Sequence, residues 1–205
     1  MAIKRFSKWV ESKEQEKVCI IIRGFPGSGK STKINALLAK HGGDYDHIFS
    51  TDNHWIPVTN QKRRRGEQVS AREELEEYKS NWSAEKLGAA HAHNFQEFQY
   101  AVDLGISPVI VDNTNITSRE FANYAQYAHK AGYKIKIEEP DSPWWNEHRP
   151  FLADKKLDPK KLDDFAKILF KKNTHGVPLE VIQRSIQRWQ DKIDLDELLG
   201  INKSS

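Results

Sequence analysis

The apolar residues of this chain gather in four short runs. Residues 18–22 are all apolar, as expected for a strand that is buried on both faces of a parallel sheet. Shorter runs at 47–50 and 108–111 predict two more strands, and the alternation over 133–137 predicts a fourth strand nearer the edge of the sheet.

Between these runs, apolar residues recur every three or four positions, which predicts helices. The expected helices cover residues 30–41, 85–104 and 118–131. Strands that alternate with helices form a parallel sheet with helices packed on its faces. We therefore expect an α/β fold in which a parallel sheet is flanked by helices.

Two stretches break this alternation. Residues 56–82 carry a basic run at 62–65 and an acidic run at 73–77, and we expect them to form an insertion after the second strand. A connection of this length inside a domain is usually functional or disordered, and the sequence does not say which. Residues 143–190 are expected to form a helical lid and tail, with an amphipathic helix over 179–189.

The length of 205 residues fits one domain with additions. Residues 1–16 are mixed in charge and are expected to form an N-terminal extension, with a short helix around Phe6 and Trp9. The domain itself is expected over residues 17–195, and a C-terminal tail over 196–205.

Composition and charge narrow the functional classes. With 32 basic and 29 acidic residues, the net charge of +3 gives no global cationic field, so contact with nucleic acid would have to be local. The single cysteine, Cys19, excludes an internal disulfide and indicates an intracellular compartment, either cytoplasm or nucleus. The longest apolar stretch is far too short to span a bilayer, so no membrane partner is expected. The oligomeric state is left open.

Segment 24–31 reads Gly-Phe-Pro-Gly-Ser-Gly-Lys-Ser, which matches the pattern G-x-x-x-x-G-K-[ST] between the first predicted strand and helix. In this setting the glycines turn successive backbone N–H groups toward an anion, and the helix N-terminus adds partial positive charge. Lys30 would contact the β and γ phosphates of ATP or another NTP, and the Ser31 hydroxyl would contact Mg²⁺. The expected nucleotide-binding residues are Gly24, Phe25, Pro26, Gly27, Ser28, Gly29, Lys30, Ser31 and Thr32.

Two carboxylates follow the second and third predicted strands, where parallel sheets bind their ligands. Asp52 is placed to accept a proton from an attacking hydroxyl, or alternatively to cap a turn. Asp112 is placed to hold a Mg²⁺-bound water, or alternatively marks a polar strand exit. The polar residues Asn113, Thr114 and Asn115 would then form a rim that faces the substrate.

The remaining motifs favour a kinase. The sequence contains no guanine-specifying N-K-x-D pattern, which argues against a switch GTPase, and it is short for a motor protein. A kinase needs the phosphate loop, a carboxylate base, a polar strand end for the metal, and a mobile cationic lid. Lys171 and Lys172 in the helical tail could supply that cation, although such a pair is also common on a solvated helix face.

Five segments occur in a characteristic order: IIRGFPGSGKST, IFSTDNHW, GISPVIVDNTNI, IEEPDSPWW and FKKNTHGVPLEVIQR. Together they resemble the P-loop kinase domains of the polynucleotide kinase type. The closest likeness is to the Nedd-four-binding-protein family, and the phage and animal polynucleotide kinases are more distant. The likeness covers about residues 17–188 and is poorest over 56–82.

This resemblance implies a P-loop NTPase/kinase fold and the ATP-dependent phosphorylation of 5′-hydroxyl ends of RNA or DNA, in nucleic-acid repair or processing. By position, Asp52 matches the general base of the family, and Lys30 and Ser31 match its phosphate and magnesium contacts. Lys172 falls where the family commonly has a lid arginine, so the catalytic residues implied are Asp52, Lys30 and Lys172. A lysine keeps the charge of that arginine but loses its bidentate fork.

The resemblance also implies residues for the acceptor. Trp55 stands where phage-type enzymes have an arginine that contacts substrate phosphate, and an aromatic ring there could stack on a terminal base. Asn94 matches part of a His-Asn pair on the crossover helix, and we expect it to line the acceptor cleft. The expected substrate-binding residues are Trp55, Asn94, Asn113, Thr114 and Asn115.

Two other functions remain open from the sequence. The phosphate loop cannot identify the acceptor, so a small-molecule kinase on the same fold is one alternative. An ATP-controlled binding module that transfers no phosphate is the other. The sequence does not decide between RNA and DNA, or between a single strand and a duplex end.

Overall fold

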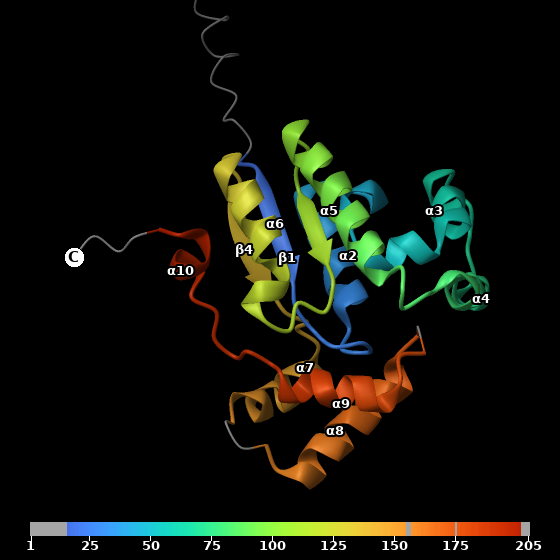
Figure 1. Ribbon diagram of the computed structural model, residues 1–205, viewed down its shortest axis with the longest axis vertical. Coiled ribbons are helices and arrows are strands. Elements are labelled where there is room, and N and C mark those ends of the chain that lie inside the picture. The colour runs from blue at the N-terminus through green and yellow to red at the C-terminus, as the bar shows by residue number, and fades with distance from the viewer. Residues whose placement is uncertain (1–15, 155–156, 175, 202–205) are drawn as a thin grey trace, which may run out of the picture.

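Four parallel strands form the centre of the computed structural model, which describes residues 16–154, 157–174 and 176–201 (Figure 1). The strand order is β2-β3-β1-β4. The strands are β1 (Val18–Ile22), β2 (Ile48–Phe49), β3 (Val109–Asp112) and β4 (Lys134–Glu138). The expected α/β fold is confirmed, with β1 in the interior of the sheet and β4 at one edge.

The register of the strands places their carboxyl ends at one level. In this register Ile22, the last residue of β1, pairs with Asp112 of β3 on one side and with Glu138 of β4 on the other. The chain therefore leaves β1 and β3 side by side, and residues that follow these two strands meet at the same edge of the sheet.

One face of the sheet is covered by helix α2 (Lys30–His41). Val18, Ile20 and Ile22 of β1 pack there with the apolar residues of α2. The helix begins directly after the phosphate loop and ends at Gly42, which adopts the left-handed conformation that glycine tolerates at a helix end. The strand and this helix therefore hold both ends of the loop.

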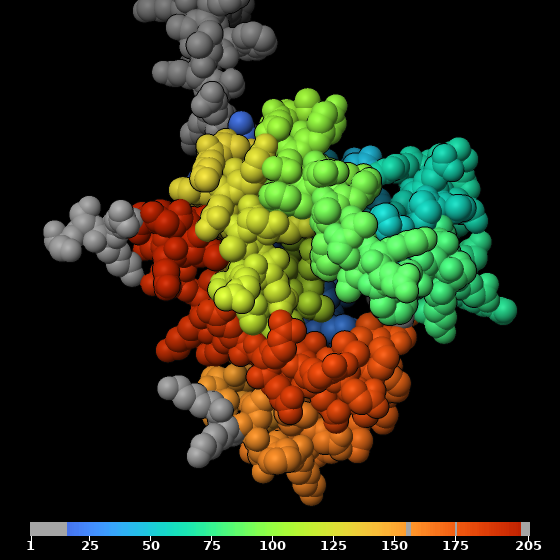
Figure 2. Space-filling view, in the orientation of Figure 1, coloured from blue at the N-terminus to red at the C-terminus, as the bar shows by residue number. Residues whose placement is uncertain are grey.

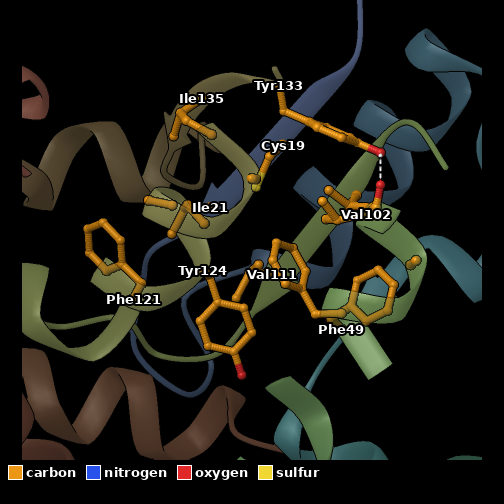
Figure 3. Close-up of a cluster of buried hydrophobic side chains, with 14 residues drawn as sticks. Cys19, Ile21, Phe49, Val102, Val111, Phe121, Tyr124, Tyr133 and Ile135 are labelled. Carbon is orange, nitrogen blue, oxygen red and sulfur yellow. Dashed lines mark hydrogen bonds between the residues drawn. The ribbon is translucent and has the colours of Figure 1, made fainter. Parts of the chain in front are cut away.

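The other face is covered by helices α5 (Leu87–Asp103) and α6 (Ser118–Lys130). Cys19 and Ile21 point to this side and join a larger cluster of buried residues, which Figure 3 shows. Burial raises the pKa of the Cys19 thiol strongly, so this cysteine is an inert core residue.

Residues 56–82 form two helices, α3 (Pro57–Arg64) and α4 (Ala71–Asn81), which project to one side of the sheet (Figure 1). The Ser70 side chain accepts the backbone N–H of Glu73 and the Glu73 side chain accepts that of Ser70, a capping box that fixes the start of α4. The insertion is therefore ordered, which the sequence had left open. The short 3₁₀ helices that precede it are η1 (Tyr45–His47) and η2 (Thr51–Trp55).

The helical tail packs across the carboxyl ends of the strands, below the sheet in Figure 1. Its elements are α7 (Pro143–His148), η3 (Arg149–Ala153), α8 (Pro159–Lys172) and α9 (Leu179–Gln187). These elements lie within residues 143–190.

The C-terminal boundary expected at residue 195 is corrected by the structure. Helix α10 (Leu195–Leu199) runs across that boundary, and its leucines pack against the core beside α6. The carbonyl oxygen of Leu198 accepts a hydrogen bond of 2.8 Å from the Gln126 side chain. The predicted N-terminal helix around Phe6 and Trp9 lies outside the described residues.

Within the described ranges, no helix combines the length and the apolar character needed to cross a lipid bilayer.

Candidate active site

The phosphate loop follows β1 as a tight turn that requires glycine at specific positions. Gly27 and Gly29 adopt φ values of +77° and +97°, which residues with a side chain rarely adopt. A Cβ atom at Gly27 would also overlap the carbonyl oxygen of Leu169 in α8. The loop therefore lies directly against the helical tail.

Phe25 anchors this loop in the tail. Its ring is 0 % exposed and contacts the rings of Trp145, Phe165 and Trp189 at centroid distances of 6.1, 6.0 and 5.0 Å. Phe25 was expected to bind the nucleotide, and it does border the cleft. Its side chain, however, belongs to the core of the tail, so its part is to seat the loop.

Arg23, the residue just before the loop, is a buried cation that sequence reasoning missed. Its guanidinium donates to the carbonyl oxygens of Asn115 (2.9 Å), Ile116 (2.9 Å) and Gln190 (2.6 Å), and stacks 4.1 Å from the ring of Trp189. Burial lowers its pKa to about 10, opposed by the charge of Glu139, and the side chain stays charged at neutral pH. It ties the end of β1 to the β3 exit and to the tail.

One cleft of about 510 Å³ brings together the phosphate loop, both strand exits, the insertion and the tail. Blue atoms from the beginning of the described chain are visible between the yellow-green body and the red tail in Figure 2. The predicted site residues that line this cleft are Phe25, Pro26, Gly27, Gly29, Lys30, Ser31, Thr32, Asp52, Asp112, Asn113, Thr114 and Lys172.

Gly24 and Ser28, the other two predicted loop residues, lie behind this lining. Gly24 donates its backbone N–H to the carbonyl oxygen of Thr114 over 3.0 Å, so it links the loop to the β3 exit. The Oγ atom of Ser28 is buried and has no hydrogen-bond partner among the described residues. A buried polar atom of this kind, inside a turn of glycines, is suited to a bound phosphate oxygen.

The residues present also fit Mg²⁺. Ser31 and Asp112 both line the cleft, and both line a second pocket of about 420 Å³ that adjoins it. In the described part of the chain no three His, Cys, Asp or Glu side chains form a metal cage. Mg²⁺ is commonly bound by one or two carboxylates together with substrate phosphates, which matches this donor set.

Asp52 lies in the first turn of η2 and faces the phosphate loop across the cleft. Ser50 is the N-terminal cap of η2, so Asp52 is not the capping residue that the alternative reading considered. The Tyr78 hydroxyl, from α4 of the insertion, donates a hydrogen bond to Oδ1 of Asp52 over 3.1 Å. Sequence reasoning missed Tyr78, although the Ser70-x-x-Glu73 capping signature marks the start of its helix.

The neighbouring residue, Thr51, fixes η2 to the sheet. Its backbone N–H donates to Oδ1 of Asn113 over 3.0 Å, and its hydroxyl lies 3.0 Å from Nδ1 of His91. Asn113, which was expected at the substrate rim, therefore also holds the segment that carries Asp52.

Three of the expected substrate-binding residues are buried, and these predictions are corrected. Trp55, Asn94 and Asn115 are only 2 %, 3 % and 1 % exposed. The amide group of Asn94 donates to the hydroxyl of Tyr124 over 3.0 Å, and that of Asn115 to the carbonyl oxygen of Ile22 over 2.6 Å. None of the three can stack on or hydrogen-bond an acceptor from these positions.

Lys172 borders the cleft from the end of α8, but its ammonium group is engaged elsewhere. The Nζ atom lies 3.9 Å from the ring centroid of Trp144, within the range of a cation–π interaction. Lys172 would have to leave this ring before it could act on a phosphate.

The basic run of the insertion is neutralised by acidic neighbours. Each of its four cations has a carboxylate partner within 4.0 Å; the pairs are Lys62–Glu73, Arg63–Glu74, Arg64–Asp46 and Arg65–Glu67. An unpaired basic run would attract a polyanion, and these carboxylate partners weaken that attraction.

A parallel sheet, a glycine-rich loop between β1 and α2, and carboxylates at two neighbouring strand exits define the class: a P-loop nucleotide-binding domain with a kinase-like α/β fold. A family model described as an AAA domain matches residues 19–149. This match covers more than half of the chain, and the protein belongs to that family.

Curated relatives are similar to this chain over most of its length. NEDD4-binding protein 2 of Homo sapiens is 30 % identical over 173 residues, which cover 84 % of this chain and 8 % of that protein. YLP motif-containing protein 1 is 23 % identical over 180 residues in both Homo sapiens and Rattus norvegicus, covering 85 % of this chain and 7 % or 11 % of those proteins. The chain thus spans about a tenth of the length of these relatives.

Proposed function

We propose that this protein transfers the γ-phosphate of ATP to the 5′-hydroxyl end of a polynucleotide. The observation that carries this proposal is the single cleft in which Asp52 faces Lys30 and Ser31 of the phosphate loop. A carboxylate on the acceptor side and a phosphate cradle on the donor side are the parts that phosphoryl transfer to an alcohol requires.

On the donor side, the backbone N–H groups of the loop and the ammonium group of Lys30 bind the phosphates of ATP. Ser31 and Asp112 would hold a Mg²⁺ ion, which when bound neutralises charge on the phosphate oxygens. Lys172 adds a second cation from the tail once it leaves the ring of Trp144.

On the acceptor side, Asp52 takes the proton of the terminal hydroxyl as the oxygen attacks the γ-phosphorus. The bond between that phosphorus and its bridging oxygen breaks, and ADP leaves. Phe25 packs the loop into the tail and Thr51 bonds η2 to Asn113, so the phosphate loop and Asp52 are each held in place at the cleft.

An apolar rim on the insertion side suits a nucleic-acid acceptor. Leu87 lines the cleft and is exposed, and the exposed Trp82 lies between Tyr78 and Leu87 in the chain, directly after α4. Exposed aromatic rings stack on bases regardless of sequence. We assign this contact to Trp82 in place of the buried Trp55.

A small-molecule kinase is the second candidate, and the paired basic run supports it. With Lys62 to Arg65 neutralised by carboxylates, little unpaired charge from the insertion would attract a polyanion. A polynucleotide kinase is expected to lose affinity for its acceptor as salt rises, whereas a kinase for a neutral alcohol is not.

The experiment is end-labelling of a 5′-hydroxyl oligonucleotide with γ-labelled ATP, as RNA and as DNA. We expect labelling by the wild-type protein and its loss in Asp52→Ala and Lys30→Met. The matched controls are Asp103→Ala and Lys40→Met, which change an exposed aspartate at the end of α5 and an exposed lysine at the end of α2.

Wild-type protein that labels neither acceptor, or Asp52→Ala protein that labels equally well, would contradict the proposal. Labelling of small alcohols alone, with no dependence of the acceptor KM on salt, would favour the second candidate.

A further inference from the structure

We propose that Tyr78 is a positioning residue for Asp52, and that it couples the docking of the insertion to proton removal from the acceptor. This inference rests on the proposed function, because it gives the carboxylate of Asp52 the part of the base. The family resemblance implies no role for any residue of α4.

The contact itself is a directed hydrogen bond. The Tyr78 hydroxyl donates to Oδ1 of Asp52 over 3.1 Å, and both side chains line the cleft. Burial, and then the charge of Asp52, raise the pKa of Tyr78. The phenol therefore stays protonated at neutral pH and acts as a donor to the carboxylate.

Helix α4 holds this hydroxyl in place through the residues on both sides of Tyr78. The carboxylate of Glu77 accepts the backbone N–H groups of Val58 and Thr59 at the start of α3, over 2.7 and 2.8 Å. The amide of Asn81 donates to the carbonyl oxygen of Trp55, at the end of η2, over 2.9 Å. Because η2 also carries Asp52, the donor and the acceptor of the hydrogen bond are tied to one segment.

The hydrogen bond gives the two carboxylate oxygens of Asp52 different roles. Oδ1 is held by Tyr78, so Oδ2 is the atom that takes the proton from the acceptor hydroxyl. The electron pair of that O–H bond forms the new bond to the γ-phosphorus. Without Tyr78 the carboxylate can rotate, and fewer of its conformations present an oxygen to the acceptor.

The test is Tyr78→Phe, which keeps the ring and removes the hydroxyl. We expect kcat to fall about tenfold while the KM values for ATP and for the oligonucleotide change less than about twofold. A purely structural role for Tyr78 would lower the unfolding midpoint and raise the KM values together with any loss of kcat, whereas a positioning role lowers kcat alone.

Tyr100→Phe is the matched control, since Tyr100 is 68 % exposed and lies outside the cleft. Unfolding midpoints are measured on the same preparations. If Tyr78→Phe does not fold, Asn81→Ala loosens the end of α4 without removing the hydroxyl, and it should give the same loss of kcat.

Unchanged kcat in a folded Tyr78→Phe protein, with an active wild type, overturns the role of Tyr78 and leaves the proposed function standing. A wild-type protein that phosphorylates no 5′-hydroxyl end overturns both.

Discussion

The two sides of the cleft are held in opposite ways. The phosphate loop is fixed by buried apolar contacts, with the Phe25 ring inside the core of the tail and Arg23 beneath it. The insertion across the cleft has no such core: α4, described over its whole length, buries no residue, and α3 buries only Thr59 and Asn60. Its attachments are hydrogen bonds and ion pairs.

This difference matters because the donor and the acceptor require different properties of the side that binds them. A site for phosphate has to be preorganised, because its hydrogen-bond donors must already point inward when the anion arrives. An acceptor side held by polar contacts has a smaller free energy of opening, since few buried apolar groups oppose it. The donor side should therefore respond to core mutations, and the acceptor side to pH and salt.

The largest effect is expected from Phe25→Ala. Removing a fully buried ring costs about 3–5 kcal/mol in the free energy of unfolding. We expect this loss in denaturant unfolding, together with loss of nucleotide binding, because the loop loses its anchor in the tail.

Phe170→Ala is the matched control, because Phe170 is 46 % exposed on α8. If both variants were equally stable, the loop would not depend on the tail core and the contrast between the two sides would fail.

A smaller and more local effect is expected from Glu77→Ala. The variant removes two hydrogen bonds at the start of α3, one exposed and one partly buried, each of which contributes about 0.5–1.5 kcal/mol. Hydrogen exchange should speed up in α3 and α4 and stay unchanged in β1. Glu76→Ala, which removes only an exposed pair with Arg72, is the control; equal exchange in both variants would show that Glu77 does not hold the insertion.

The same carboxylate gives the insertion a pH dependence. Burial tends to raise the pKa of Glu77, but hydrogen bonds from Thr59 and Val58 more than offset it and hold the pKa below its ordinary value. The stabilisation is therefore complete above the unfolded pKa of about 4.3 and is lost as the pH falls through the folded pKa.

We expect exchange protection of α4 to decline below about pH 4.3 in the wild type, after correction for intrinsic exchange rates, and Glu77→Ala to remove this contribution. A wild type and a variant with the same pH profile would contradict it.

The smallest effect is expected from the exposed pair between Arg64 and Asp46, 2.7 Å apart. A double-mutant cycle with Arg64→Met and Asp46→Asn should give a coupling free energy of about 0.2–1 kcal/mol that shrinks as salt rises. A coupling that salt does not reduce would indicate a tighter attachment of the insertion than the contacts suggest.

The sheet and the phosphate loop could be predicted because their signals are local. A continuous apolar run such as 18–22 is typical of a strand buried on both faces, which is what β1 is, and the loop motif specifies its own backbone. The positions of Asp52 and Asp112 followed from the rule that residues after parallel strands meet at one edge.

The acceptor side could not be predicted in the same way, because its burial depends on distant segments. Trp55 lies in η2, which packs against α5 and against α4 of the insertion, and Asn81 donates to its carbonyl oxygen. The charges of 62–65 were visible in the sequence, but their partners were not. Asp46, for example, lies in a 3₁₀ turn well before the run.

The packing of Phe25 also has a consequence for how the protein is made. Its ring partners, Trp145, Phe165 and Trp189, are translated more than a hundred residues after the loop, a delay on the order of ten seconds or more at ordinary ribosomal speed. During that interval β1 can pair with its neighbouring strands, while the phosphate loop still lacks the aromatic rings against which Phe25 packs. Newly made protein would thus form its sheet first. It would become able to bind nucleotide only later, when the helices of the tail emerge from the ribosome.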